Sequence, residues 1–200
     1  MCDVASTERP GELSPLARAA AAGELPKWAS VSRPRRAHMG RVASLLGEWA
    51  EALGLSPEER LRWLAVGWLH DALREEDPEK LRVEVPAPLR DLPASVLHGP
   101  AAAERLAGEL DDRSLDAIRY HTIGHPRLDT LGKALYLADF LEPGRDFLTE
   151  WRAELRARMP GEMNAVLTEV LASRLRHLVE GFRPLRAETA RFWSALVTEE

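Results

Sequence analysis

The chain has 200 residues, 45% of them hydrophobic and 30% charged, with a formal net charge of −5 at pH 7. This size and composition fit one soluble globular domain, and the acidic balance argues against broad non-specific nucleic-acid binding, which needs a basic surface. No apolar run approaches the roughly 20 residues that span a bilayer, and no signal peptide is evident. The single cysteine, Cys2, excludes internal disulfides and cysteine-based metal sites. We therefore expect a cytoplasmic protein.

The first third of the chain predicts a tail followed by three helices. Residues 1–12 are polar and lack periodicity, so we expect a disordered tail there. The dipeptide Ser14-Pro15 is typical of a helix start, and this short helix ends by Gly23. Apolar residues at helical spacing predict a second helix over 35–53. Ser56 caps a third helix, whose inward-facing residues we expect to be Leu61, Leu64, Ala65 and Trp68.

Residues 77–97 are rich in proline and predict the principal long loop, in which only a short helix or turns can form. The one candidate strand is Arg82-Val83-Glu84-Val85, where apolar and charged residues alternate. The sequence therefore predicts an all-α protein whose tryptophans mostly fill the core. Helices are expected to resume at 100–110, 112–121, 129–141, 146–158, 161–181 and 185–198.

The doublet His70-Asp71 closes the apolar run of the third helix. An imidazole and a carboxylate are costly to bury unless a partner compensates them, and a divalent metal ion is one such partner. Helical spacing turns ligand-type side chains of other helices towards the core as well. A lone histidine on an apolar face is more often a hydrogen-bonded core residue, but several together indicate a shared metal site. The candidates, nitrogen and oxygen ligands suited to iron, manganese or zinc, are His38, His70, Asp71, His98, His121 and Asp139.

The order of these residues resembles the HD-domain metal-dependent phosphohydrolase superfamily. Three further segments narrow the resemblance: His98-Gly99-Pro100-Ala101-Ala102, the stretch from Ala117 to Gly124, and the stretch from Leu135 to Arg145. Together they are similar to the bacterial YqeK-type HD proteins, which are symmetrical bis(5′-nucleosyl)-tetraphosphatases. The similarity extends over residues 35–146, just over half of the chain.

The resemblance implies a fold, a cofactor and a reaction. The fold is an HD-domain helical bundle over residues 13–145 with the metal site at the centre of its core helices, and residues 146–200 form C-terminal helices packed on the same domain. The cofactor is a pair of divalent metal ions, with iron expected and manganese, zinc or magnesium as alternatives. Asp71 is the natural bridge, and His98 and His121 complete the second ion's ligands. The reaction is cleavage of diadenosine tetraphosphate into two ADP by a metal-activated hydroxide.

Residues beside these motifs are expected to contact the substrate. Arg74 and Arg145 offset charge on the phosphates and act with Asp71 in catalysis. Arg74 stands where the family usually has lysine, and Ile123 replaces a threonine, so these positions bear on substrate preference. His177 is remote from every motif and is expected to be structural. The expected substrate-binding residues are Arg74, Thr122, Gly124, His125 and Arg145, although His125 also suits an exposed loop position.

Two other functions stay open. The same metal site would serve an HD-type nucleotidase or deoxynucleotide phosphohydrolase, although six ligands favour the dinucleotide hydrolase over an enzyme with four ligands and one metal. A regulatory module that binds nucleotides without turnover is the alternative outside enzymes. In every case the expected partner is a nucleotide, with no nucleic acid and no membrane. The helices of 146–198 build either a wall of the nucleotide pocket or the surface of a homodimer.

Overall fold

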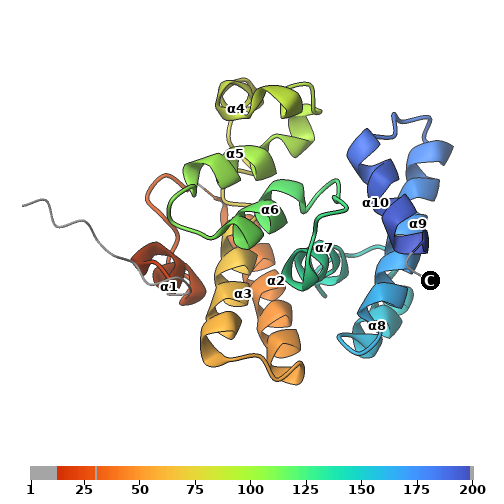
Figure 1. Ribbon diagram of the computed structural model, residues 1–200, viewed down its shortest axis with the longest axis horizontal. Coiled ribbons are helices and arrows are strands. Elements are labelled where there is room, and N and C mark those ends of the chain that lie inside the picture. Colours follow the sequence, from red (N-terminus) through yellow and green to blue (C-terminus); the bar gives the residue numbers. More distant parts are fainter. Residues whose placement is uncertain (1–12, 30, 199–200) are drawn as a thin grey trace, which may run out of the picture.

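The computed structural model describes residues 13–29 and 31–198, which fold into ten α-helices and two short 3-10 turns (Figure 1). No β-sheet forms within these residues, which confirms the predicted all-α fold. The expected tail, residues 1–12 with Cys2, lies outside the described residues. No helix within the described ranges combines the length and apolar character needed to cross a membrane.

Most helices follow one another through short connections, and the proline-rich stretch holds only a short helix and the two 3-10 turns, as predicted. The turns, Ala87–Leu89 and Ala94–Val96, lie between α4 and α5. The helices are α1 (Pro15–Ala21), α2 (Arg33–Ala52), α3 (Pro57–Leu69), α4 (Pro78–Glu84), α5 (His98–Arg105), α6 (Asp112–Tyr120), α7 (Thr130–Leu141), α8 (Thr149–Arg158), α9 (Met163–Glu180) and α10 (Ala187–Thr198).

Side-chain caps fix where the helices of the central bundle begin. Ser14, Ser32 and Ser56 each accept a hydrogen bond from the backbone N–H three residues on, at 3.1–3.3 Å, and each is followed within two residues by proline. Asp111 and Asp129 cap α6 and α7 in the same way. These caps satisfy backbone donors that the first turn of a helix leaves free. They therefore set the register of the helices that carry the candidate ligands.

Helices α2 and α3 form a closely packed antiparallel pair (Figure 1). A Cβ at Gly67 of α3 would lie 2.6 Å from the Cα of Ala43 in α2, so the absence of a side chain lets the two backbones approach. Because the pair is antiparallel, the start of α2 lies beside the end of α3. The ring of His38 consequently lies 5.5 Å from that of His70.

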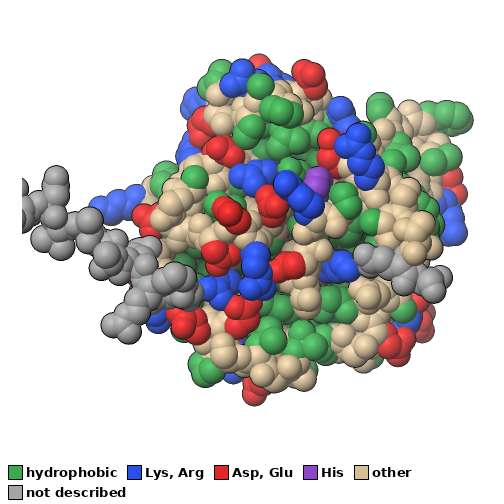
Figure 2. Space-filling model, in the orientation of Figure 1, with side chains coloured by type: hydrophobic (Ala, Val, Ile, Leu, Met, Phe, Trp, Pro, Cys, Tyr) green, Lys and Arg blue, Asp and Glu red, His purple; other side chains and the backbone are tan. Residues whose placement is uncertain are grey.

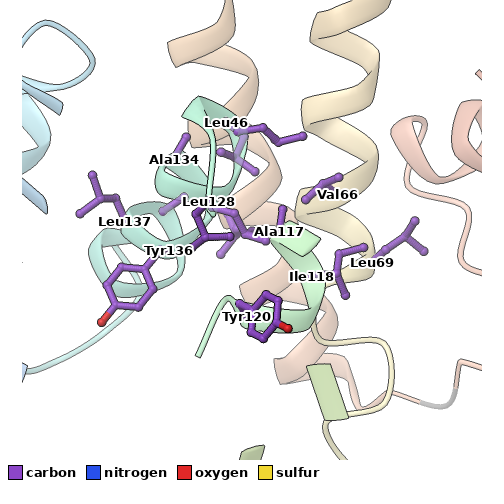
Figure 3. Close-up of a cluster of buried hydrophobic side chains, with 14 of the residues drawn as sticks. Leu46, Val66, Leu69, Ala117, Ile118, Tyr120, Leu128, Ala134, Tyr136 and Leu137 are labelled. Atoms are coloured by element: carbon purple, nitrogen blue, oxygen red, sulfur yellow. The ribbon is translucent and has the colours of Figure 1, made fainter. Parts of the chain in front are cut away.

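Helices α6 and α7 complete the core against this pair. Leu46 of α2, Val66 of α3, Ile118 of α6 and Ala134 of α7 are fully buried in one cluster (Figure 3). On the other side of α7, α9 packs against it and α10 packs against α9. Helix α7 thus stands between the N-terminal bundle and the C-terminal helices (Figure 1).

The one candidate strand, residues 82–85, is not a strand, because most of it belongs to α4. Asp77 caps α4, Pro78 is its first residue, and the helix runs through residue 84. Leu81 and Val85, four residues apart, are buried, whereas Val83 is 74% exposed. The buried residues therefore follow the spacing of a helix, and the alternation of charge with valine in this segment does not reflect a buried face.

Three further predictions differ in detail. Helix α8 begins at residue 149 rather than 146, because Leu148 has a left-handed backbone (φ 45°) that interrupts a helix. The helix expected over 100–110 covers 98–105. In α3, Leu61, Leu64 and Trp68 were predicted to face inward but are only half-buried. Helices α1 and α2 both pack on α3, so its buried face is centred on other residues. The most buried side chains of α3 are Trp63, Ala65, Val66 and Leu69.

Replacement of Gly67 by alanine is expected to lower the free energy of unfolding by about 1–3 kcal/mol, because the added methyl group overlaps the α2 backbone. Chemical denaturation would measure the change. The matched control is Gly161→Ala, where the nearest atom to an added Cβ is 3.8 Å away. Equal stabilities of the two variants would contradict the close approach of α2 and α3.

Candidate metal centre and adjoining cavity

Six side chains from separate parts of the chain converge at one point in the bundle. Four come from helix ends: His70 and Asp71 follow the last turn of α3, His98 opens α5 and His121 follows α6. Two come from within helices α2 and α7. The Asp139 side chain is 16% exposed. The others are buried, and the structure therefore brings together all six predicted ligands, namely His38, His70, Asp71, His98, His121 and Asp139.

The carboxylate of Asp71 lies between two pairs of histidines. Its Oδ2 atom is 3.6 Å from His38 Nε2 and 3.7 Å from His70 Nε2. Its Oδ1 atom is 3.0 Å from His98 Nε2 and 3.6 Å from His121 Nε2. Each oxygen thus belongs to a different group of possible ligand atoms, and within each group these atoms lie within 4.8 Å of one another.

The outer ring nitrogens of His70 and His121 hold these two imidazoles in place. His70 Nδ1 donates to the carbonyl of Gly67 at 2.8 Å, and His121 Nδ1 donates to the carbonyl of Ile118 at 2.7 Å. A carbonyl can only accept, so Nδ1 carries the proton and Nε2 of each neutral ring is left with a lone pair. His70 Nε2 is buried without a hydrogen-bond partner among the described residues. Metal-binding histidines have this arrangement, with the second nitrogen held by a carbonyl or carboxylate.

Burial and neighbouring charges together set the charge state of the cluster. Burial lowers the pKa of His70 to about 4 and lowers the pKa of His98, so both rings are neutral near pH 7. Burial opposes ionisation of Asp139, but the hydrogen bond with His38 and the charge of Arg145 outweigh it and lower the pKa of this carboxyl group. Neutral imidazoles and ionised carboxylates are the forms in which these groups bind metal. The donor set fits divalent cations.

Glu142 is a buried carboxylate that the sequence reasoning did not select. It accepts hydrogen bonds from His38 Nδ1 at 3.1 Å, from the Arg41 guanidinium and from the backbone N–H of Gly144 at 2.7 Å. Burial raises its pKa, but the hydrogen bonds from His38 and Arg41 prevail and lower it to about 2. Glu142 follows Asp139 by three residues, and this spacing could have placed it beside the cluster.

Arg35 is the second contact that the sequence reasoning missed. Its Nη1 atom lies 2.6 Å from Asp71 Oδ2, on the side that faces His38. The side chain is 26% exposed and precedes His38 by three residues on α2. A guanidinium here compensates the buried charge of Asp71 and lies within reach of any anion that approaches the cluster.

Three of the five predicted substrate-binding residues lie at the cluster. The Thr122 hydroxyl is 3.0 Å from His121 Nε2. Arg145 donates to the side chain of Asp139 at 2.5 Å and to its carbonyl at 2.9 Å. Arg74 follows Asp71 in the turn after α3, and its guanidinium has neither a hydrogen bond nor an ion pair within the described part of the chain.

The other two lie elsewhere. Gly124 has φ +72° and is buried against α10, where a Cβ would meet the Phe192 ring at 2.2 Å. His125 stacks on Tyr120, with ring centroids 4.3 Å apart. Neither lines the cavity at the cluster, and their substrate contacts stay predictions from the sequence.

A cavity of about 960 Å³ extends from the cluster towards the C-terminal helices. Thr122, Asp139 and Arg145 line it at the cluster, and residues of α9 and of the segment before α10 line its far wall. His177, expected to be structural, is exposed and belongs to this wall. Periodicity could not show this, because the position of α9 depends on its packing against α7.

Arg152 of α8 fixes the loop between the cluster and this wall. The side chain is buried and donates to the carbonyls of Phe140, Glu142, Arg145 and Phe147 at 2.5–3.2 Å. Buried guanidinium groups need such partners, because an unpaired buried charge is costly. The side chain of Arg152 therefore holds the backbone of the loop that contains Arg145 and Phe147.

Comparison with known proteins agrees with this geometry. The family model for the HD domain matches residues 35–144. The chain is 33% identical over 120 residues to the symmetrical bis(5′-nucleosyl)-tetraphosphatase of Bacillus subtilis (strain 168), covering 58% of this chain and 63% of that protein. It is 29% identical over 108 residues to the protein of the same name from Halalkalibacterium halodurans, covering 52% and 57%. The chain thus spans about three-fifths of the length of these curated relatives.

The fold is also that of a solved structure. A crystal structure from Clostridium acetobutylicum, described as a "predicted HD superfamily hydrolase involved in NAD metabolism", superposes with a TM-score of 0.74 over 85% of this chain and 92% of that one. The sequence identity is 23%, so the likeness concerns the fold. Because it covers most of both chains, it extends well beyond residues 35–144.

Replacement of Glu142 by glutamine is expected to weaken metal binding about 10–100-fold, the usual effect of removing the group that orients a ligating histidine. The amide cannot give His38 Nδ1 and Arg41 the same charged acceptor. Competition with a chromogenic chelator would measure the affinity. Glu48→Gln, an exposed change on α2, is the matched control and should leave metal affinity as it is. Equal affinities in both variants would refute the positioning role of Glu142.

Proposed function

Since the chain belongs to the HD domain family, we propose that it is a metal-dependent phosphohydrolase that cleaves diadenosine tetraphosphate symmetrically into two ADP. The names of the curated relatives support the reaction. The site supports the chemistry, because buried histidines and ionised carboxylates lie beside a cavity large enough for a nucleotide, and Asp139 of the cluster lines that cavity.

The observation that carries this proposal is the division of Asp71 between two groups of histidines. We assign His38, His70 and Asp139 to one divalent ion, His98 and His121 to the other, and Asp71 to both. Iron is the expected metal, with manganese, zinc and magnesium as alternatives. When bound, such a pair of ions supplies Lewis acidity that polarises phosphoryl oxygens and acidifies water.

The residues around the ions would hold the substrate and balance its charge. Arg74 has no partner within residues 13–29 and 31–198 and is free to bind a phosphate group. Arg35 pairs with Asp71 and Arg145 pairs with Asp139, so both guanidinium groups lie at the cluster and can stabilise the additional negative charge of the transition state. The Thr122 hydroxyl can donate to a phosphate oxygen where the cavity meets the cluster.

An HD-type nucleotidase is the competing enzyme, because the same ligands would serve it. The volume of the cavity, about 960 Å³, favours a larger substrate than a mononucleotide. A regulatory module without turnover is the other alternative, and the intact ligand set argues against it. The cytoplasmic location and the homodimer stay predictions from the sequence.

The proposed function is tested by elemental analysis of anaerobically purified protein together with chromatography of the products from diadenosine tetraphosphate. We expect about two metal ions per chain and ADP as the only nucleotide product. AMP with ATP, or nucleoside with free phosphate, would refute the symmetrical reaction. Metal without turnover of any nucleotide would refute the enzyme.

Metal content distinguishes the two ligand groups. Asp71→Ala should remove both ions, because it supplies an oxygen to each group, whereas His98→Ala should remove one. His125→Ala is the matched control, since His125 lies outside both groups, and should retain the wild-type metal content. Unchanged metal content in Asp71→Ala would overturn the ligand assignment.

Arg74→Ala is expected to lower kcat/KM for diadenosine tetraphosphate about 10–100-fold, the loss of a charged hydrogen bond to phosphate. Arg145→Ala should also reduce turnover, and both variants should keep their metal. Steady-state kinetics with elemental analysis would measure the effects. Arg60→Ala, which breaks only a surface pair with Glu51 far from the cluster, serves as the control. Loss of metal in either variant would show that the arginine supports the ligands rather than the substrate.

A further inference from the structure

The cavity continues well past the cluster, and the C-terminal helices form its outer part. Residues 173–189, from α9 to the start of α10, supply about half of its lining, and Phe140 and Phe147 also line it. Its volume of about 960 Å³ is at the upper end of the range for small-molecule sites. A single nucleotide at the cluster would leave this outer part empty.

The outer wall is basic in a chain whose net charge is −5. Arg174, Arg176, Arg183 and Arg186 all line it, and Glu180 is the one acidic residue among them. On the face drawn in Figure 2, by contrast, basic and acidic side chains are interspersed.

None of these arginines forms an ion pair within the described residues. Arg174 donates to the carbonyl of Thr122 at 2.8 Å, and Arg186 donates to the carbonyl of Asp91 at 3.0 Å, so neither charge is neutralised. Arg176 and Arg183 are exposed and have no side-chain hydrogen bond in the same part of the chain. Uncompensated guanidinium groups on a concave surface are typical of a site for phosphate groups.

Aromatic rings also line the cavity, among them those of Phe140 and Phe147. Phe147 is 41% exposed, although the Arg152 guanidinium lies 4.8 Å from its ring centroid. The Phe140 ring lies 5.6 Å from it, edge to face. A partly exposed ring that is held in place by its neighbours offers a surface on which a nucleobase can stack.

The wall is fixed relative to the cluster. The Thr189 hydroxyl of α10 donates to the carbonyl of Ile123 at 2.8 Å, and Arg174 of α9 donates to that of Thr122. These carbonyls belong to the two residues after His121, which is a candidate ligand. The outer wall and the cluster are therefore joined through one short segment and can hold two parts of one ligand at a defined separation.

We propose that the outer wall binds one nucleoside diphosphate half of the substrate, with Arg176 and Arg183 on its phosphates and Phe147 against its base, while the other half lies at the cluster. This rests on the proposed function and extends it, because it explains how a dinucleotide is preferred to a mononucleotide. The arginines and Phe147 are binding residues here, and the reacting phosphorus lies at the cluster.

Calorimetric titration of the protein with ADP in the presence of a chelator tests the outer wall without turnover. The double variant Arg176→Ala/Arg183→Ala should bind ADP at least about tenfold more weakly, about 1.4 kcal/mol. Phe147→Ala should weaken ADP binding but leave inorganic pyrophosphate binding unchanged, because pyrophosphate has no base. Arg191→Ala is the matched control, since Arg191 is exposed on α10 and does not line the cavity. Wild-type ADP affinity in the double variant would overturn the proposal.

Kinetics of the metal-loaded enzyme separate this proposal from the proposed function. In the double variant KM for diadenosine tetraphosphate should rise about tenfold with kcat and metal content retained, the signature of lost uniform binding. Turnover by the wild type together with an unchanged KM in the double variant would refute the outer site alone. Absence of turnover in the wild type would refute the proposed reaction, and arginine-dependent binding of ADP would still support the outer site.

Discussion

The structure depends on the burial of one carboxylate, that of Asp71, among four imidazoles. A buried charge is tolerated only where other groups compensate it, and the surrounding helices are arranged to do so. Arg35 does this at 2.6 Å, and the four histidines come from α2, α5 and the ends of α3 and α6. The close approach of α2 and α3 at Gly67 follows from the same requirement, because it brings the end of one helix beside the start of the other.

The ends of helices α3 and α6 orient two of these four histidines. The last carbonyls of an α-helix have no intrahelical donor, and in α3 and α6 the histidine just past the end uses one of them. His70 and His121 each donate from Nδ1 to the carbonyl three residues earlier. A single contact thus satisfies the helix terminus, sets the ring tautomer and turns Nε2 inwards. The His38 ring lies inside a helix and cannot use this device, so Glu142 takes the place of the carbonyl.

Helical periodicity and the His70-Asp71 doublet were enough to predict the all-α fold and the six residues that meet in the cluster. They succeeded because each candidate lay on the buried face of its own helix or at its end. Contacts made between elements could not be predicted in this way. The pairing of Arg35 with Asp71 and the place of His177 on the cavity wall depend on how helices lie against one another. The alternation of apolar and charged residues at 82–85 suggested a strand, but Val83 is exposed on a helix rather than buried on a strand.

The hydrogen bonds of Arg152 limit where the chain can be truncated without leaving carbonyl groups unpaired. The recognisable family region ends at residue 144, yet the carbonyl groups of Phe140 and Glu142 within it are satisfied by a side chain of α8. Separating the chain at the family boundary would leave these acceptors, and the loop after α7, without their donor. A unit that folds on its own therefore extends at least through α8.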